Sequence, residues 1–195
     1  MMRKFCDEIS QKQAKIDSSL HDQQRTNSNL LREFDELKSE NSRLSDELVD
    51  LQSRSMRDNL MFYNFKELSS PEERKNEKCL ELIYDFCENK LGMPDFRHNV
   101  KIDHAHRVGS FSSTKTRPIV AKFNFFQDKL SVKQTAYSKQ KETGIKVGDQ
   151  YPKIIQERRR KLIPHLVSAK EQNKNAVLAY DKLFINGQRF IPPSN

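Results

Sequence analysis

The first 56 residues carry a seven-residue repeat of apolar side chains that neither glycine nor proline interrupts. With Leu20 at heptad position a, every d position except one is apolar. The d series is Met2, Ile9, Ile16, Gln23, Leu30, Leu37, Leu44 and Leu51. This repeat is typical of a coiled coil. A lone amphipathic helix packed on a globular domain is the alternative, but at about 1.5 Å per residue the helix would be about 80 Å long, too long for a small domain to cover.

Polar and apolar residues alternate at the a positions. Asn27 and Asn41 flank Phe34, and Gln13 occupies the a position two heptads before Asn27. Buried polar layers reduce stability but fix the register and oligomeric state of a coiled coil. The heptads therefore predict a parallel homo-oligomer and leave dimer and trimer open. The side chains expected at the helix–helix contact are Leu20, Asn27, Leu30, Phe34, Leu37, Asn41, Leu44, Leu48 and Leu51.

The net charge of +8 is placed unevenly along the chain. Residues 1–56 contain 9 Lys or Arg and 11 Asp or Glu, whereas residues 57–195 contain 26 and 16. A strongly basic folded region usually binds a polyanion, such as nucleic acid or an acidic membrane surface. A basic surface that only keeps the protein soluble is the alternative.

Other features narrow the class of protein. The sequence has no run of 18 apolar residues, so it predicts no membrane span. The first residues, MMRKFCDEIS, lack the apolar core of a signal peptide. The cysteines Cys6, Cys79 and Cys87 form neither a CxxC pair nor a disulfide framework, which is typical of proteins in a reducing compartment.

From residue 57 the pattern becomes one of mixed strands and helices. Helices are expected from the N-cap Ser70 to about Leu91 and over 127–139, and strands over 59–65, 100–109, 118–125 and 144–148. The order β-α-β-β-α-β is a split βαβ arrangement, which the RNA recognition motif (RRM) shares. We therefore predict an α+β chain with three domains: a coiled-coil helix at 1–56, an RRM-like domain at 57–148 and a basic C-terminal domain at 149–195.

The expected strands fit the RRM signatures only in part. Met61 stands where a stacking aromatic is usual, and Pro118 and Val120 occupy the two stacking positions of the third strand. We therefore expect weak base stacking on the sheet and a larger contribution from basic side chains. The helix after Ser70 should bury one apolar face, made of Leu80, Ile83, Cys87 and Leu91.

The C-terminal segment combines a basic helix with a hairpin. The helix should bury one side, and Asn186-Gly187 predicts a type I′ turn between two strands. About 45 residues are too few to fold alone, so this segment should pack on the preceding domain. The side chains expected to be buried are Ile155, Leu162, Leu166 and Ala169.

Five short segments follow the heptads in order: RDNL, HRVG, RPIVAKF, QERRRKL and AYDKLFING. With the coiled coil, this order resembles the first-open-reading-frame protein of LINE-type retrotransposons. The resemblance implies a homotrimer on a parallel coiled coil that binds single-stranded RNA with little sequence preference, with single-stranded DNA as the alternative. It also implies nucleic-acid chaperone activity and a place in cytoplasmic ribonucleoprotein particles or the nucleus. By motif position it implies RNA contacts from Arg57, Asn59, Arg107, Arg117, Arg158, Arg159, Tyr180 and Lys182.

Residue chemistry supports several of these positions. Arg107, Lys115 and Arg117 bracket one polar loop and could follow a phosphate backbone. The arginines at 158–160 fan over about 200° of a helix, so they cannot all face one ligand. A solvated face is the alternative for that run. Tyr180 either stacks on a base or packs within the hairpin.

Enzymatic motifs are absent from the sequence, which contains no P-loop, HExxH or GxSxG. His104 and His106 are a candidate metal pair, but only Asp103 accompanies them, and the chain is expected to hold neither metal nor cofactor. We expect a binding protein rather than an enzyme. The alternative is a coiled-coil structural adaptor whose basic domain binds protein or an acidic membrane surface.

Overall fold

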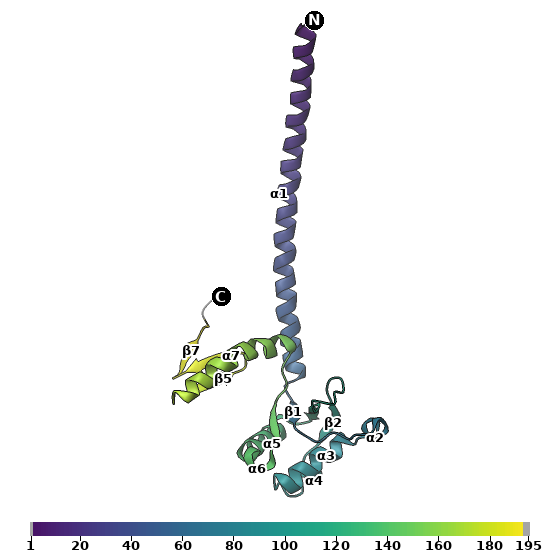
Figure 1. The fold of residues 1–195 in the computed structure, drawn as a ribbon, viewed down its shortest axis with the longest axis vertical. Helices are drawn as coiled ribbons and strands as arrows, with labels where there is room; N and C mark the ends of the chain where they lie inside the picture. Colours follow the sequence, from purple (N-terminus) through teal and green to yellow (C-terminus); the bar gives the residue numbers. More distant parts are fainter. Residues whose placement is uncertain (1, 193–195) are drawn as a thin grey trace. The chain divides into compact units, whose positions relative to one another are not determined.

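The computed structural model describes the backbone of residues 2–192 and the side chains of residues 11–192. The chain combines helices with antiparallel sheets and divides into two compact units, Met1–Leu48 and Val49–Asn195 (Figure 1). The ranges 57–148 and 149–195 both fall in the second unit, so their division into two domains stays a prediction.

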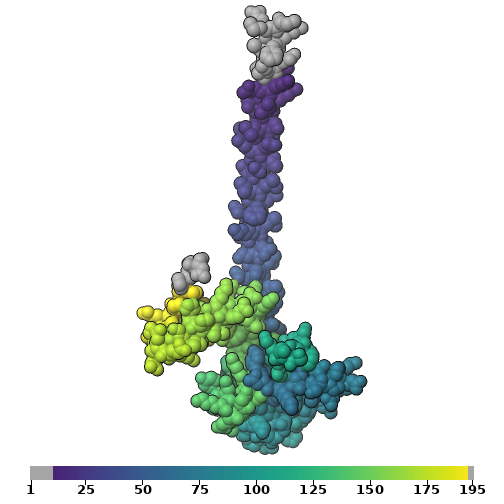
Figure 2. Space-filling view, viewed as in Figure 1, coloured from purple at the N-terminus to yellow at the C-terminus, as the bar shows by residue number. Residues whose placement is uncertain are grey.

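A single helix, α1 (Met2–Ser55), contains nearly the whole heptad region, and a long N-terminal helix is therefore confirmed. Every side chain from Leu20 to Leu51 that was predicted at the helix–helix contact is exposed on the single chain; Leu37, for example, is 70% exposed. Figure 2 shows the side chains of this helix, coloured purple to blue, as a narrow column of atoms. The side chains of Met2 and Ile9 lie outside the described residues. Association through this helix stays a prediction.

Four antiparallel strands form the first sheet, in the order β2-β3-β1-β4. The strands are β1 (Asn59–Tyr63), β2 (Ile102–Arg107), β3 (Ile119–Phe123) and β4 (Lys146–Asp149). All four were expected, although β1 ends early because Asn64 adopts a φ of 72°. The connecting helix α5 (Phe126–Ser138) lies within one residue of its predicted range.

The prediction of one helix from Ser70 to Leu91 is wrong. Ser70 occupies the N-cap position, without a capping hydrogen bond from its side chain, and Pro71 is the first residue of α2 (Pro71–Lys75). The chain leaves helical geometry before α3 (Cys79–Asp85). Glu77 lies in this break, where its carboxylate accepts two hydrogen bonds from Arg107. This long-range ion pair favours the break over local helix propensity. Elements that were not expected are the π-helical turn η1 (Phe86–Lys90) and the short helices α4 (Phe96–Asn99) and α6 (Gln140–Thr143).

The main core lies between the first sheet and its helices. Alternate residues of β1 and β3 face this core, as the two-residue period of a strand requires. The predicted apolar helix face is confirmed, with three of its four residues buried and Leu80 packed against the others. The residues that make this contact are Leu60, Phe62, Ile83, Cys87, Leu91, Ile119, Ala121 and Phe123.

The C-terminal segment folds as α7 (Lys153–Glu171) packed on a second antiparallel sheet (Figure 1). This sheet has three strands in sequence order: β5 (Ala176–Ala179), β6 (Lys182–Ile185) and β7 (Gln188–Phe190). Asn186 and Gly187 join β6 to β7 with φ of 52° and 80°, which confirms the predicted type I′ turn. Of the predicted core side, Leu166 is only half-buried, whereas Ile155, Leu162 and Ala169 are buried.

Candidate nucleic-acid interface

The face of the first sheet opposite the helices is aliphatic at its centre. Met61 pairs across strands with Val120, and both side chains are buried although neither belongs to the main core. His104 and His106 on β2 stack on each other, with ring centroids 5.5 Å apart. The central pair offers no aromatic surface, and weak base stacking on the sheet stays a prediction.

Aromatic and basic side chains gather instead in a cleft of about 370 Å³ where four segments of the second unit meet. We call it the junction cleft. Its walls come from the end of α1, from α5, from the segment between β4 and α7, and from the turn between β5 and β6. The lining residues include Ser53, Arg57, Phe126, Lys129, Lys133, Asp149, Tyr151 and Tyr180.

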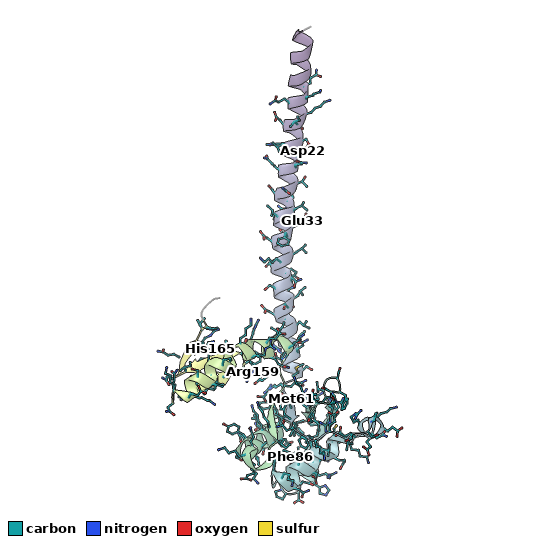
Figure 3. The ribbon with its side chains drawn as sticks, in the orientation of Figure 1. Asp22, Glu33, Met61, Phe86, Arg159 and His165 are labelled. Carbon is teal, nitrogen blue, oxygen red and sulfur yellow. The ribbon has the colours of Figure 1, made fainter. Side chains whose placement is uncertain are left out.

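Two cation–aromatic contacts border the junction cleft. The guanidinium of Arg57 lies 4.5 Å from the ring centroid of Phe126, and that of Arg159 lies 4.4 Å from the ring centroid of Tyr151. Tyr180 meets Tyr151 edge to face, with centroids 5.8 Å apart. Figure 3 shows Arg159 on α7, the helix that follows Tyr151 in the chain. Rings beside positive charge are the combination that binds bases and phosphates of a single strand.

Asp149 is the acidic group of the junction cleft. Its carboxylate accepts hydrogen bonds from the ammonium groups of Lys129 and Lys133 and from the phenol of Tyr151. Partial burial raises the pKa of the Asp149 carboxyl, but the hydrogen bonds and charges of the two lysines outweigh burial and hold it below the ordinary value of 3.8. Burial, and then the negative charge of Asp149, raise the pKa of Tyr151.

Tyr180 has an uncommon backbone conformation, with a φ of 51° in the left-handed region. This region costs a non-glycine residue about 1–2 kcal/mol. Ser53 donates its hydroxyl hydrogen to the carbonyl of Val49, so the phenol of Tyr180 is the donor in the 2.5 Å bond to Ser53 Oγ. Arg159 donates to the carbonyl oxygen of Tyr180. These bonds hold the side chain, which is 41% exposed, at the cleft.

Two further predicted residues lie close to the same turn. Arg158 donates a hydrogen bond of 3.0 Å to Asp181, and Lys182 is the exposed first residue of β6. Asn59, at the start of β1, donates to Gln150 at 2.7 Å, and Gln150 lines the junction cleft. The structure therefore brings most of the predicted contact residues toward one region.

Arg107 has a different environment. Its side chain is 3% exposed, and its Nε and Nη2 atoms both pair with the carboxylate of Glu77. The remaining donors bond to the carbonyl oxygens of Phe65, Lys66 and Arg117. Since a guanidinium has five N–H donors and all are taken here, we leave Arg107 out of the proposed interface.

The polar loop after β2 places its basic residues away from the junction cleft. Arg117 pairs with the carboxylate of Glu67, which lowers the pKa of that carboxyl. Lys115 lies in the exposed part of the loop and, with Lys66, lines a separate cavity of about 390 Å³. Neither Lys115 nor Arg117 lines the junction cleft with Arg57 and Tyr180.

Sequence reasoning missed Phe126, Lys133, Asp149 and Tyr151. Tyr151 stands in DQYP, the junction between the two predicted domains, and the lysines at 129 and 133 are four residues apart on a helix. In the sequence, the two lysines favour an exposed helix face. They do not show which other segments line the cleft with that helix.

Neither a protein-family model nor a curated protein sequence matches the chain. Across the described residues, no helix has both the length and the apolar character that crossing a membrane requires. Residues 11–192 also contain no cluster of three or more His, Cys, Asp or Glu side chains that could hold a metal ion.

Proposed function

We propose that this protein is an oligomeric single-stranded RNA-binding protein and nucleic-acid chaperone of the kind that LINE-type retrotransposons encode in their first open reading frame. The observation that carries the proposal is the junction cleft. Its three aromatic residues, Phe126, Tyr151 and Tyr180, lie beside Arg57, Lys133 and Arg159. A ribonucleoprotein component of cytoplasmic particles is the corresponding cellular role.

The chemistry of the cleft suits a strand whose bases are unpaired. Aromatic rings contribute about 1–3 kcal/mol per stacked base and accept every base, because each base has a π-face. Guanidinium and ammonium groups attract the phosphates without reading the sequence. Binding through these groups would be tight and tolerant of sequence, as a chaperone requires.

The fold of the second unit supports an RRM-like interpretation of residues 57–148. The elements β1, α3, β2, β3, α5 and β4 follow the β-α-β-β-α-β order, and the sheet is antiparallel throughout. In the proposed protein the sheet is chiefly a scaffold. It holds Asn59 and Asp149, at the ends of neighbouring strands, beside the cleft.

The exposed heptad side chains of α1 support the oligomeric part of the proposal. The apolar residues from Leu20 to Leu51 form a stripe that a second helix can cover, and Asn27 and Asn41 would fix its register. A parallel trimer would carry three basic clefts, and several clefts on one strand increase avidity.

Titration of a fluorescein-labelled single-stranded RNA against the full-length protein tests the proposal. The charge-removing variant Lys133→Gln should weaken binding severalfold. Lys75→Gln removes the same charge from α2, outside the cleft, and should leave the affinity nearly unchanged. If the protein binds no single strand at micromolar concentration, the structural adaptor becomes the better interpretation. If the protein binds RNA but the two variants behave alike, the cleft is not the interface.

A further inference from the structure

Asp149 places a negative charge in a cleft that we propose to bind a polyanion, so its presence there needs an explanation. Part of the explanation is structural. Asp149 Oδ1 pairs at 2.9 Å with the ammonium of Lys129, which is 4% exposed. A buried ammonium is strongly unfavourable without a counter-ion, and Oδ1 supplies one.

The second carboxylate oxygen has other partners. Asp149 Oδ2 accepts a hydrogen bond of 2.5 Å from Lys133 and one of 3.2 Å from the phenol of Tyr151. Neither partner requires a counter-ion, since Lys133 is 38% exposed and the phenol of Tyr151 is uncharged when it donates. Both line the junction cleft. Oδ1 therefore pairs with a buried lysine, whereas Oδ2 contacts two side chains that line the cleft.

The contacts at Oδ2 help to hold two side chains of the cleft in place. The phenol end of Tyr151 is held by Asp149, while the guanidinium of Arg159 lies over the ring. The ammonium of Lys133 shares the same acceptor, so it lies next to the Tyr151 hydroxyl. A ring and a cation fixed side by side match the base and the phosphate of one nucleotide.

We propose that Asp149 is a positioning residue that, through Oδ2, holds the Tyr151 ring for stacking on a base, beside the Lys133 ammonium that attracts the adjoining phosphate. This inference rests on the proposed function, because it assigns how the same cleft recognises a nucleotide. It adds Tyr151 as the base-stacking residue, a role that no motif in the sequence indicated.

The substitution Asp149→Asn separates positioning from simple electrostatics. Loss of a negative charge strengthens binding to any polyanion if charge alone matters. Loss of the positioning acceptor instead weakens the part of binding that depends on bases. The full-length protein and the variant are titrated with labelled oligouridylate and with an abasic ribose-phosphate strand of the same length.

We expect Asp149→Asn to weaken oligouridylate binding about tenfold, the scale of one lost base stack, and to leave the abasic strand bound equally or more tightly. Stronger binding of both strands overturns the inference in favour of electrostatics. Equal weakening on both strands overturns it in favour of a general structural role for Asp149.

A second variant keeps the test decisive if Asp149→Asn fails to fold. Tyr151→Phe keeps the ion pairs of Asp149 and removes only the phenol bond. It should weaken oligouridylate binding about threefold and leave the abasic strand unaffected. If both variants fold, the double variant should bind oligouridylate no more weakly than Asp149→Asn alone, because Asp149 acts through Tyr151. Unchanged oligouridylate binding by Tyr151→Phe overturns the inference.

A spectroscopic titration checks directly that the Asp149 carboxylate lies against the Tyr151 phenol in solution. The tyrosinate absorbance of Tyr151 is obtained as the difference between a protein and its Tyr151→Phe counterpart. Because the charge of Asp149 raises the pKa of Tyr151, Asp149→Asn should lower that pKa. An unmoved pKa overturns the inference.

Failure of the inference is distinguishable from failure of the proposed function. If the unmodified protein binds neither strand, the proposed function itself is wrong. If it binds oligouridylate and Lys133→Gln weakens binding while Asp149→Asn does not, only the positioning role of Asp149 is wrong.

Discussion

The guanidinium of Arg107 and the carboxylate of Glu77 form a two-point ion pair inside the second unit, with Nε–Oε2 and Nη2–Oε1 distances that are both 2.7 Å. The side chains are 3% and 5% exposed. The pair joins the end of β2 to the break between α2 and α3. It therefore fixes the path of a segment for which local sequence favours a continuous helix.

Replacement of Arg107 by alanine should destabilise the protein by about 3–5 kcal/mol, because the Glu77 carboxylate would stay buried without a partner. Urea unfolding measures the loss. Arg97→Ala is the matched control, since the Arg97–Glu81 pair is exposed and its loss should reduce stability far less. Unchanged stability in Arg107→Ala, together with weaker RNA binding, would identify Arg107 as a contact residue after all.

Glu67 gives the protein an acid-sensitive contribution to stability. The hydrogen bond from the Arg117 side chain holds the pKa of the Glu67 carboxyl below its ordinary value of 4.5. A carboxyl whose pKa is lowered on folding stabilises the protein above its unfolded pKa, and this stabilisation is lost as the pH falls through the folded value. The difference in unfolding free energy between the protein and Glu67→Gln should thus be constant above about pH 5 and shrink below about pH 4.

Urea unfolding at a series of pH values checks this profile. Glu142→Gln removes the same charge from an exposed residue of α6 and serves as the comparison. A difference profile for Glu67→Gln that stays flat down to pH 3 would contradict the assigned pairing with Arg117.

Arg159 should contribute a phosphate contact from the border of the junction cleft. Arg159→Ala should weaken RNA binding and reduce the slope of log K against log salt by about 0.7, the value for one contact on a single strand. Arg160→Ala removes the same charge from the next residue of α7, which is exposed. Equal slope changes in the two variants would show a general effect of the basic helix rather than a contact at the cleft.

The proposed oligomer should increase avidity. Sedimentation equilibrium should give three times the 23.0 kDa mass of one chain, and Leu30→Glu with Leu44→Glu should give a monomer because both substitutions place charge at d positions. The monomer should bind a long RNA about 10²–10⁴-fold more weakly than the oligomer. On a strand too short to reach two clefts, the two forms should bind alike.

A monomer mass for the unmodified protein would contradict the coiled coil. A dimer mass would keep the coiled coil and count against the resemblance to the LINE-type protein. Equal affinities on the long strand would show that α1 serves a purpose other than avidity.

Local patterns were sufficient to predict part of the fold. The heptads predicted α1, the mixed pattern from residue 57 onward predicted the strands of the first sheet, and Asn186-Gly187 predicted the turn between β6 and β7. The break at Glu77 was not predictable, because its partner is 30 residues away and the pattern around it is helical. The junction cleft was predicted only through Arg57 and Tyr180. Its other residues come from segments that meet only in the folded chain.

Arg107 illustrates why residue type alone is a weak guide to an interface. In the sequence it stands beside a polar basic loop and is indistinguishable from Arg117 or Arg57. The burial and the hydrogen-bond partners of these arginines differ in the folded chain. Arg107 has every donor occupied within the chain, whereas the Arg57 side chain lies exposed at the cleft.

The left-handed backbone of Tyr180 has a consequence for how this position can change over evolutionary time. Glycine adopts that conformation without strain, so selection for stability alone would favour glycine at the turn between β5 and β6. Selection for RNA binding would oppose a change to glycine, because glycine has no aromatic ring. In a library of variants at position 180, survivors chosen for folding should therefore drift toward glycine, and survivors chosen for RNA capture should keep an aromatic residue.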